Sequence, residues 1–146
     1  MTLPPDDCLN CFKGIRRAEV LLGEGVDYSV FSDAKPLPEL NGWNGSSVNW
    51  DLSIGGALQE LFDRPLDADG QPHFKFGAIS IPRIEVDKII SRYGDNNLAY
   101  ELREDNGNIF HGHILFSDTL EPRQKTTIYG ALVYVSIRHP REYQNN

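Results

Sequence analysis

Apolar and polar positions in the last third of the chain follow the pattern of β-strands. Residues 98–104, 109–116 and 126–139 are rich in β-branched and aromatic residues. Asn106 and Gly107 lie between the first two runs, and this dipeptide is a strong signal for a tight hairpin turn. The pattern therefore predicts an antiparallel meander of three strands, the last of them buried on both faces.

Helical spacing is found in two stretches before this region. In residues 51–64, Asp51 is a candidate N-cap and the apolar positions share one helical face. In residues 81–94, Pro82 suits a first turn and Gly94 a C-terminal cap. With a strand predicted at 73–80, the chain is expected to form one α+β domain over residues 1–146, with about two helices and a mostly antiparallel sheet.

Turn-forming residues dominate the first third. Two early prolines make residues 1–7 an extended lead-in, and glycine, asparagine and proline predict a long loop region over residues 24–50. Trp43 and Trp50 lie near the end of this loop. Each is expected to pack against the body of the domain, and the alternative is a binding role for the exposed ring.

Composition and charge limit the class of partner. Hydrophobic residues make up 40% and charged residues 24% of the 146 residues, as in ordinary globular domains. The net charge of -7 makes the protein acidic and disfavours nucleic acid, and the densest basic group is only Lys13, Arg16 and Arg17. Because no apolar run approaches the roughly 18 residues of a membrane span and no secretory signal is visible, a cytoplasmic protein is expected.

His111 and His113 are the residues most suggestive of chemistry. If Asn106 and Gly107 form a two-residue turn, Leu102 lies opposite His111 and Tyr100 opposite His113, with both imidazoles on one face. Two neutral imidazoles at this spacing can bind one divalent metal ion, but a metal site needs further ligands. The alternative is a structural pair in an apolar sheet.

Cys8 and Cys11 form a C-x-x-C motif. It supplies only two of the four ligands of a structural zinc site, and no second such motif exists in the chain. A thioredoxin-like role would require a βαβ context, which does not follow. Free thiols are therefore predicted.

Three short segments carry a resemblance to a family. They are "SVFSD" at 29–33, "SSVNW" at 46–50 and "NIFHGHI" at 108–114. In this order they resemble an uncharacterised family of small bacterial proteins with a late N-x-x-H-x-x-I strand, matched here by Asn108, His111 and Ile114. No function comes with that family, and the resemblance implies only that His111 serves its structure or a shared site.

Two functional hypotheses follow from these patterns. Because no complete catalytic constellation is visible, the favoured one is a non-enzymatic binding or accessory module with a protein partner, and the final strand offers an edge for a homo-oligomer. The alternative is a small enzyme that uses His111 and His113, with or without a divalent metal cofactor. Further groups for that enzyme are His73, Tyr100 and Glu104.

Overall fold

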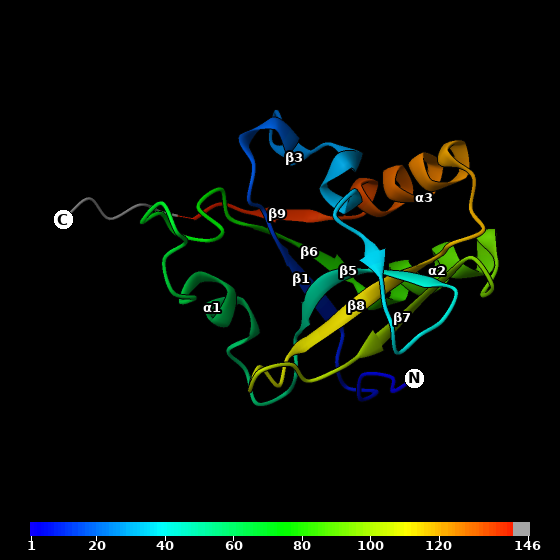
Figure 1. The fold of residues 1–146 in the computed structure, drawn as a ribbon, viewed down its shortest axis with the longest axis horizontal. Coiled ribbons are helices and arrows are strands. Elements are labelled where there is room, and N and C mark those ends of the chain that lie inside the picture. The colour runs from blue at the N-terminus through cyan, green and yellow to red at the C-terminus, as the bar shows by residue number, and fades with distance from the viewer. Residues whose placement is uncertain (142–146) are drawn as a thin grey trace.

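A seven-stranded antiparallel sheet forms the centre of the molecule in the computed structural model, which describes residues 1–141 (Figure 1). The strands run in the order β7-β8-β5-β1-β6-β9, and β4 pairs with β5. Their bounds are β1 (Asn10–Gly14), β4 (Lys35–Pro36), β5 (Trp43–Trp50), β6 (Ala78–Pro82), β7 (Leu98–Leu102), β8 (His111–Ser117) and β9 (Ile137–His139).

Three α-helices accompany this sheet. They are α1 (Ala57–Phe62), α2 (Arg83–Tyr93) and α3 (Pro122–Tyr134). A small ribbon of β2 (Leu21–Leu22) and β3 (Gly25–Val26) and two 3-10 turns, η1 (Ala18–Val20) and η2 (Tyr28–Phe31), complete the elements. The expected class, one α+β domain with a mostly antiparallel sheet, is confirmed. No helix in residues 1–141 combines the length and apolar character that crossing a bilayer requires.

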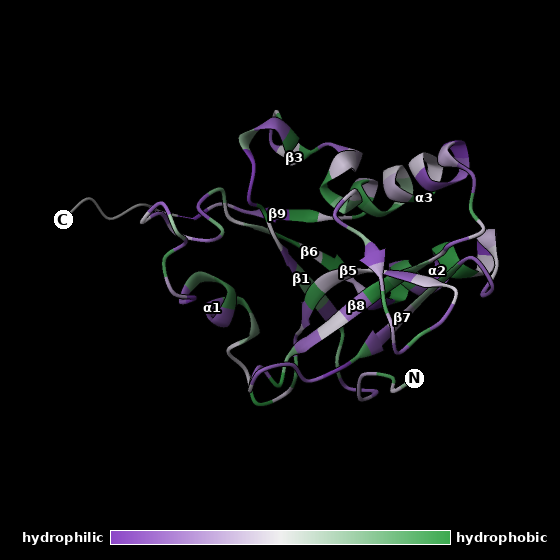
Figure 2. Ribbon diagram, viewed as in Figure 1, coloured by the Kyte–Doolittle hydropathy of each residue, from purple (hydrophilic) through white to green (hydrophobic). Residues whose placement is uncertain are grey.

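Strand alternation divides the core between the two faces of the sheet. Successive side chains of a strand point to opposite faces, and Cys11 belongs to the large core whereas Phe12 packs on the small one. The large core is completed by α2 and α3, and the small one by Leu61 of α1 together with Phe74. Figure 1 accordingly shows α1 well apart from α2 and α3, and Figure 2 shows β8 changing from hydrophilic at its start to hydrophobic beyond.

The predicted third strand of the meander, residues 126–139, is wrong. This stretch forms most of α3, and only Ile137–His139 enters the sheet as β9. The helix begins with a reciprocal capping box between Glu121 and Gln124 and has Pro122 in its first turn. Its buried residues Ile128 and Leu132 are four positions apart and therefore lie on one face of the helix. The run has this helical spacing although many of its residues are of types that favour strands.

The predicted loop at 24–50 is also corrected, because its last eight residues form β5, a central strand. Gly45 shows why a glycine occurs there. A Cβ atom at this position would lie 2.6 Å from Leu37 Cδ1 and 2.8 Å from His113 Cδ2. The glycine therefore marks close packing inside a strand rather than a turn.

The two predicted helices are present with altered bounds. The helix at 51–64 is reduced to α1, because Gly55 and Gly56 have φ angles of 79° and 99° and the chain turns before the helix begins. The predicted C-terminal cap of α2 is confirmed at Gly94, whose φ is 98°. Residues 1–7 contain no helix or strand, as expected.

Candidate functional site

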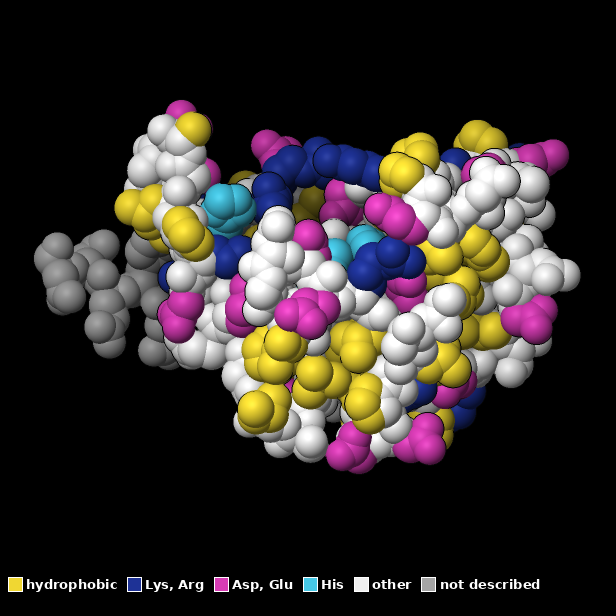
Figure 3. Space-filling view, turned by 60° about the horizontal axis from the view of Figure 1, so that its bottom comes forward, with side chains coloured by type: hydrophobic (Ala, Val, Ile, Leu, Met, Phe, Trp, Pro, Cys, Tyr) yellow, Lys and Arg dark blue, Asp and Glu magenta, His cyan; other side chains and the backbone are white. Residues whose placement is uncertain are grey.

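A cleft of about 800 Å³ opens beside the sheet, between α1, the residue 64–74 segment and the residue 30–37 segment. Strands β1, β5 and β8 contribute to its floor. Figure 3 shows this hollow with histidine side chains at its centre and an arc of lysine and arginine side chains along one rim. A cleft of this volume is in the range of sites for small ligands.

The cleft is more basic than the rest of the molecule. Five of the chain's 14 lysines and arginines line it, against three carboxylates, although the whole protein has a net charge of -7. Arg16, Arg17 and Lys35 are exposed and have no ion-pair partner within residues 1–141. Two members of the basic group seen in the sequence, Arg16 and Arg17, therefore lie at this rim.

Lys13 is the buried cation of the cleft. Its side chain is 4% exposed, and its Nζ lies 2.7 Å from Asp33 Oδ2 and donates to the Ser47 carbonyl at 3.2 Å. Burial lowers the pKa of Lys13, and the charge of Asp33 acts in the opposite direction. Lys13 therefore ties β1 to the segment after η2 and to the middle of β5.

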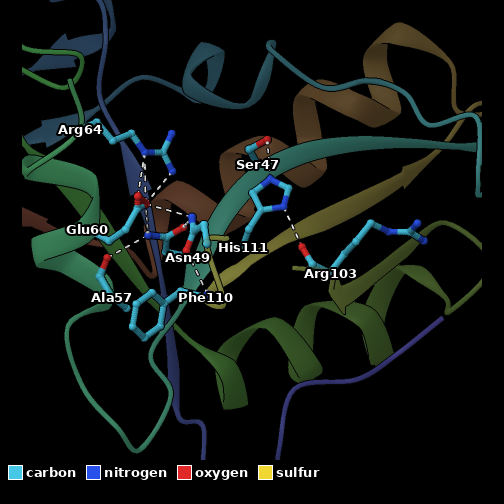
Figure 4. A network of polar contacts seen from close by, with 9 residues as sticks. Ser47, Asn49, Ala57, Glu60, Arg64, Arg103, Phe110 and His111 are labelled. Carbon is cyan, nitrogen blue, oxygen red and sulfur yellow. Dashed lines mark hydrogen bonds and ion pairs between the residues drawn. The ribbon is translucent and has the colours of Figure 1, made fainter. Parts of the chain in front are cut away.

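A polar network holds α1 against the sheet (Figure 4). Asn49 of β5 donates from Nδ2 to the Ala57 carbonyl at 2.9 Å and to Glu60 at 3.0 Å. Asn108 donates to the same Glu60 carboxylate at 2.9 Å, and Arg64 makes a forked contact with it. Burial raises the pKa of Glu60, but the hydrogen bonds from Arg64 and Asn49 outweigh this effect and the pKa is lowered.

His111 lies between Ser47 and Arg103, as Figure 4 shows. Its Nδ1 is 2.9 Å from the Arg103 carbonyl oxygen. Because a carbonyl oxygen can only accept, Nδ1 carries the proton of a neutral ring and Nε2 presents a lone pair. That Nε2 is 3.4 Å from the Ser47 hydroxyl.

His113 belongs to a buried ionic network. Its Nδ1 is 3.0 Å from Glu101 Oε1, and Arg103 donates to the same carboxylate from Nε at 2.9 Å and Nη2 at 3.1 Å. Burial lowers the pKa of His113. Burial alone would raise the pKa of Glu101. The contacts with Arg103 and His113 outweigh this effect, and the pKa of that carboxyl is lowered. Burial therefore disfavours the charged form of His113, although the Glu101 carboxylate lies beside it.

The register of β7 and β8 differs by one residue from the prediction. Glu101 lies opposite His113 and Leu102 opposite Gly112, whereas Tyr100 was expected opposite His113. The Asp105–Asn108 pair is present, but Ile109 and Phe110 form a further turn before β8. This turn adds one residue to one strand of the hairpin. Because side chains alternate between the two faces of a sheet, a register shift of one residue changes which side chains of β7 share a face with His113.

The expected metal ligands lie together but without a third member. The ring centroids of His111 and His113 are 4.8 Å apart. Within residues 1–141, no three His, Cys, Asp or Glu side chains are arranged to hold a metal ion. His73 contacts the Pro65 carbonyl, and Tyr100 donates to Asp87. Glu104 is exposed and is not among the residues that line the cleft.

The tryptophans and cysteines lie outside the cleft. Trp50 is fully buried, so its ring is not available to a partner, and Trp43 is partly exposed on β5. Cys8 and Cys11 are free, buried thiols. Burial raises the pKa of both, which disfavours the reactive thiolate.

Ser47, Glu101 and Arg64 are site residues that the sequence did not indicate. Ser47 occurs in a Gly/Ser/Asn-rich stretch typical of loops, and Glu101 alternates with apolar residues as an exposed strand residue would. Only the one-residue shift in register brings Glu101 to His113. No motif in the sequence signals any of the three residues.

The stability of the protein is expected to fall as the pH drops below about 6.5, the ordinary pKa of histidine. The folded state lowers the pKa of His113, so the unfolded chain takes up the proton first and unfolding becomes easier in acid. Urea unfolding of the wild type and His113→Gln at about pH 7.5 and about pH 5.5 measures this difference. The variant is expected to lose less stability than the wild type over this interval.

The matched control is His73→Gln, in a loop outside the sheet. The loss of stability between the two pH values is expected to be smaller in His113→Gln than in His73→Gln. An unchanged dependence in His113→Gln would contradict the prediction.

Comparisons of this chain with family models, curated proteins and solved structures gave no match. The resemblance to a family of small bacterial proteins therefore stays an expectation, and the cleft is the feature of the chain that bears on function.

Proposed function

We propose that this protein is a cytosolic binding module whose cleft accepts an anionic group of its ligand or protein partner. The observation that carries the proposal is the placement of Arg16, Arg17 and Lys35, three exposed cations without an ion-pair partner in residues 1–141, around one concave surface. Like charges gathered around a cleft raise the local concentration of a ligand of opposite charge.

The cleft also supplies groups for orientation of a ligand. Ser47 and Asn108 line it and carry polar side chains, and Phe74 adds an apolar wall on which Arg16 and Arg64 are stacked, each 5.1 Å from the ring centroid. A mixture of an apolar wall with a few polar and charged groups is typical of ligand sites. Arg64, which stacks on Phe74, is also held by the Glu60 carboxylate.

Titration with anions tests the proposal. The probes are inorganic phosphate, tripolyphosphate and a glutamate-rich peptide. Binding of each probe is measured from changes in the backbone amide chemical shifts of the protein at near-physiological salt. We expect at least one probe to shift the amides of the cleft residues. The double variant Arg17→Glu with Lys35→Glu is expected to weaken that binding by about tenfold or more.

The matched control is Arg92→Glu with Arg123→Glu. Both are exposed arginines that do not line the cleft, and the pair changes the net charge by the same amount. Shifts that are equal in the two double variants, or no shift at the cleft with any of the three probes, would overturn the proposal.

A further inference from the structure

We propose that Ser47 is a nucleophile and His111 its general base, so that the cleft can cleave an ester by transfer of the acyl group to Ser47. This inference goes beyond binding and does not depend on the charge of the ligand. It rests on the side-chain geometry of two residues from neighbouring strands, β5 and β8.

The tautomer of neutral His111 leaves Nε2 able to accept a proton. The Arg103 carbonyl fixes the proton on Nδ1, at 2.9 Å, so Nε2 is the acceptor in the neutral ring. The Ser47 hydroxyl, 3.4 Å from Nε2, is then the donor of that contact. A hydroxyl that donates to an imidazole, whose other nitrogen is oriented by an oxygen, is the arrangement that activates a serine, and the contact is often long before substrate binds.

Both residues are accessible from the cleft. Ser47 is exposed and lines the cleft together with His111. It lies on a central strand, opposite His113 in the register, and the Ser47 carbonyl accepts a hydrogen bond from Lys13. Strands hold side chains more precisely than loops do, so the pair is placed to act on a ligand that enters the cleft.

Two charges develop during the reaction. As Ser47 loses its proton, His111 becomes an imidazolium, and the carboxylate of Glu60 lines the same cleft. The acyl oxygen becomes negative at the same time, and Arg16, Arg17 and Lys35 line the same cleft. Charges of opposite sign in the same site lower the energy of such a state.

The bonds of the reaction balance with water as the co-substrate. Ser47 Oγ attacks the acyl carbon and its proton passes to His111 Nε2; the ester C–O bond breaks, and the leaving alkoxide takes that proton. Water then attacks the acyl-serine, giving up a proton to His111, and a carboxylic acid and free Ser47 are released as the proton returns to Ser47 Oγ.

A fluorophosphonate probe tests this proposal on the full chain. Ser47 Oγ would displace fluoride from phosphorus, and His111 would take the proton. Intact-mass spectrometry and peptide mapping are expected to show one adduct, located at Ser47. Ser47→Ala is expected to remove the adduct, and His111→Gln to slow its formation by about a hundredfold or more.

Ser32→Ala is the matched control, because Ser32 is a second exposed serine that lines the cleft. It is expected to label as the wild type does. Absence of an adduct at Ser47 in the wild type, or labelling that His111→Gln leaves unchanged, would overturn the proposal. Because the wild-type result needs no variant, the test stays valid if a variant fails to fold. Anion binding without labelling would support the proposed function and reject only this inference.

Discussion

Replacing Gly112 by alanine is expected to destabilise the protein by about 3 kcal/mol. Gly112 separates the two histidines on β8 and points to the opposite face. A Cβ atom there would overlap the Glu101 carbonyl oxygen and lie 2.5 Å from Trp50 Nε1. The Trp50 indole donates to that same carbonyl at 2.8 Å, so neither neighbour is free to move.

Urea unfolding of Gly112→Ala measures the effect, and Gly130→Ala is the control. Gly130 lies within α3, and an added Cβ atom has no atom within 4 Å there. That control is expected to stabilise the protein by roughly 0.5–1 kcal/mol, because alanine favours a helix. If both variants had the same stability, the close packing of Gly112 against Trp50 would be refuted.

Replacing Glu101 by alanine is expected to cost about 3 kcal/mol of unfolding free energy. Its side chain is 1% exposed and accepts from both Arg103 and His113. Removing the carboxylate leaves the Arg103 guanidinium and the buried His113 without their acceptor, and it creates a void. Thermal and urea unfolding at neutral pH measure the loss.

Glu104→Ala is the matched control from the same hairpin. Glu104 is exposed, and its substitution is expected to change stability by no more than about 0.5 kcal/mol. Glu101→Gln is a second, more conservative variant, because it keeps the volume and removes the charge. An effect of Glu101→Ala as small as that of Glu104→Ala would contradict the buried network.

The sequence predicted the elements whose signals are local. The turn at Asn106 and Gly107 and the C-terminal cap at Gly94 depend on the backbone preferences of those residues, and both are present. The prediction of a strand at 126–139 was wrong because β-branched and aromatic residues can also fill one face of a helix. Here the capping box at Glu121 and the spacing of Ile128 and Leu132 decide in favour of α3.

The site was predictable only in part, because it depends on pairing between distant strands. His111 and His113 do share a face and line one cleft. Their partners Ser47 and Glu101 come from β5 and β7. The turn at Ile109 and Phe110 inserts one additional residue into the hairpin. This insertion decides which side chain of β7 faces His113, and the local sequence does not reveal such a bulge.

The position of β1 in the sheet has a consequence for the order of folding. Cys11 pairs with Trp50 of β5 on one side and with Ile81 of β6 on the other, so a strand near the start of the chain is central to the sheet. During synthesis β1 is made before either partner. β9, which pairs with β6, is made after all the other strands. Local pairing is limited to hairpins such as β7–β8, and contacts between distant segments slow folding. The nascent chain must therefore keep β1 unpaired until β5 and β6 have been made.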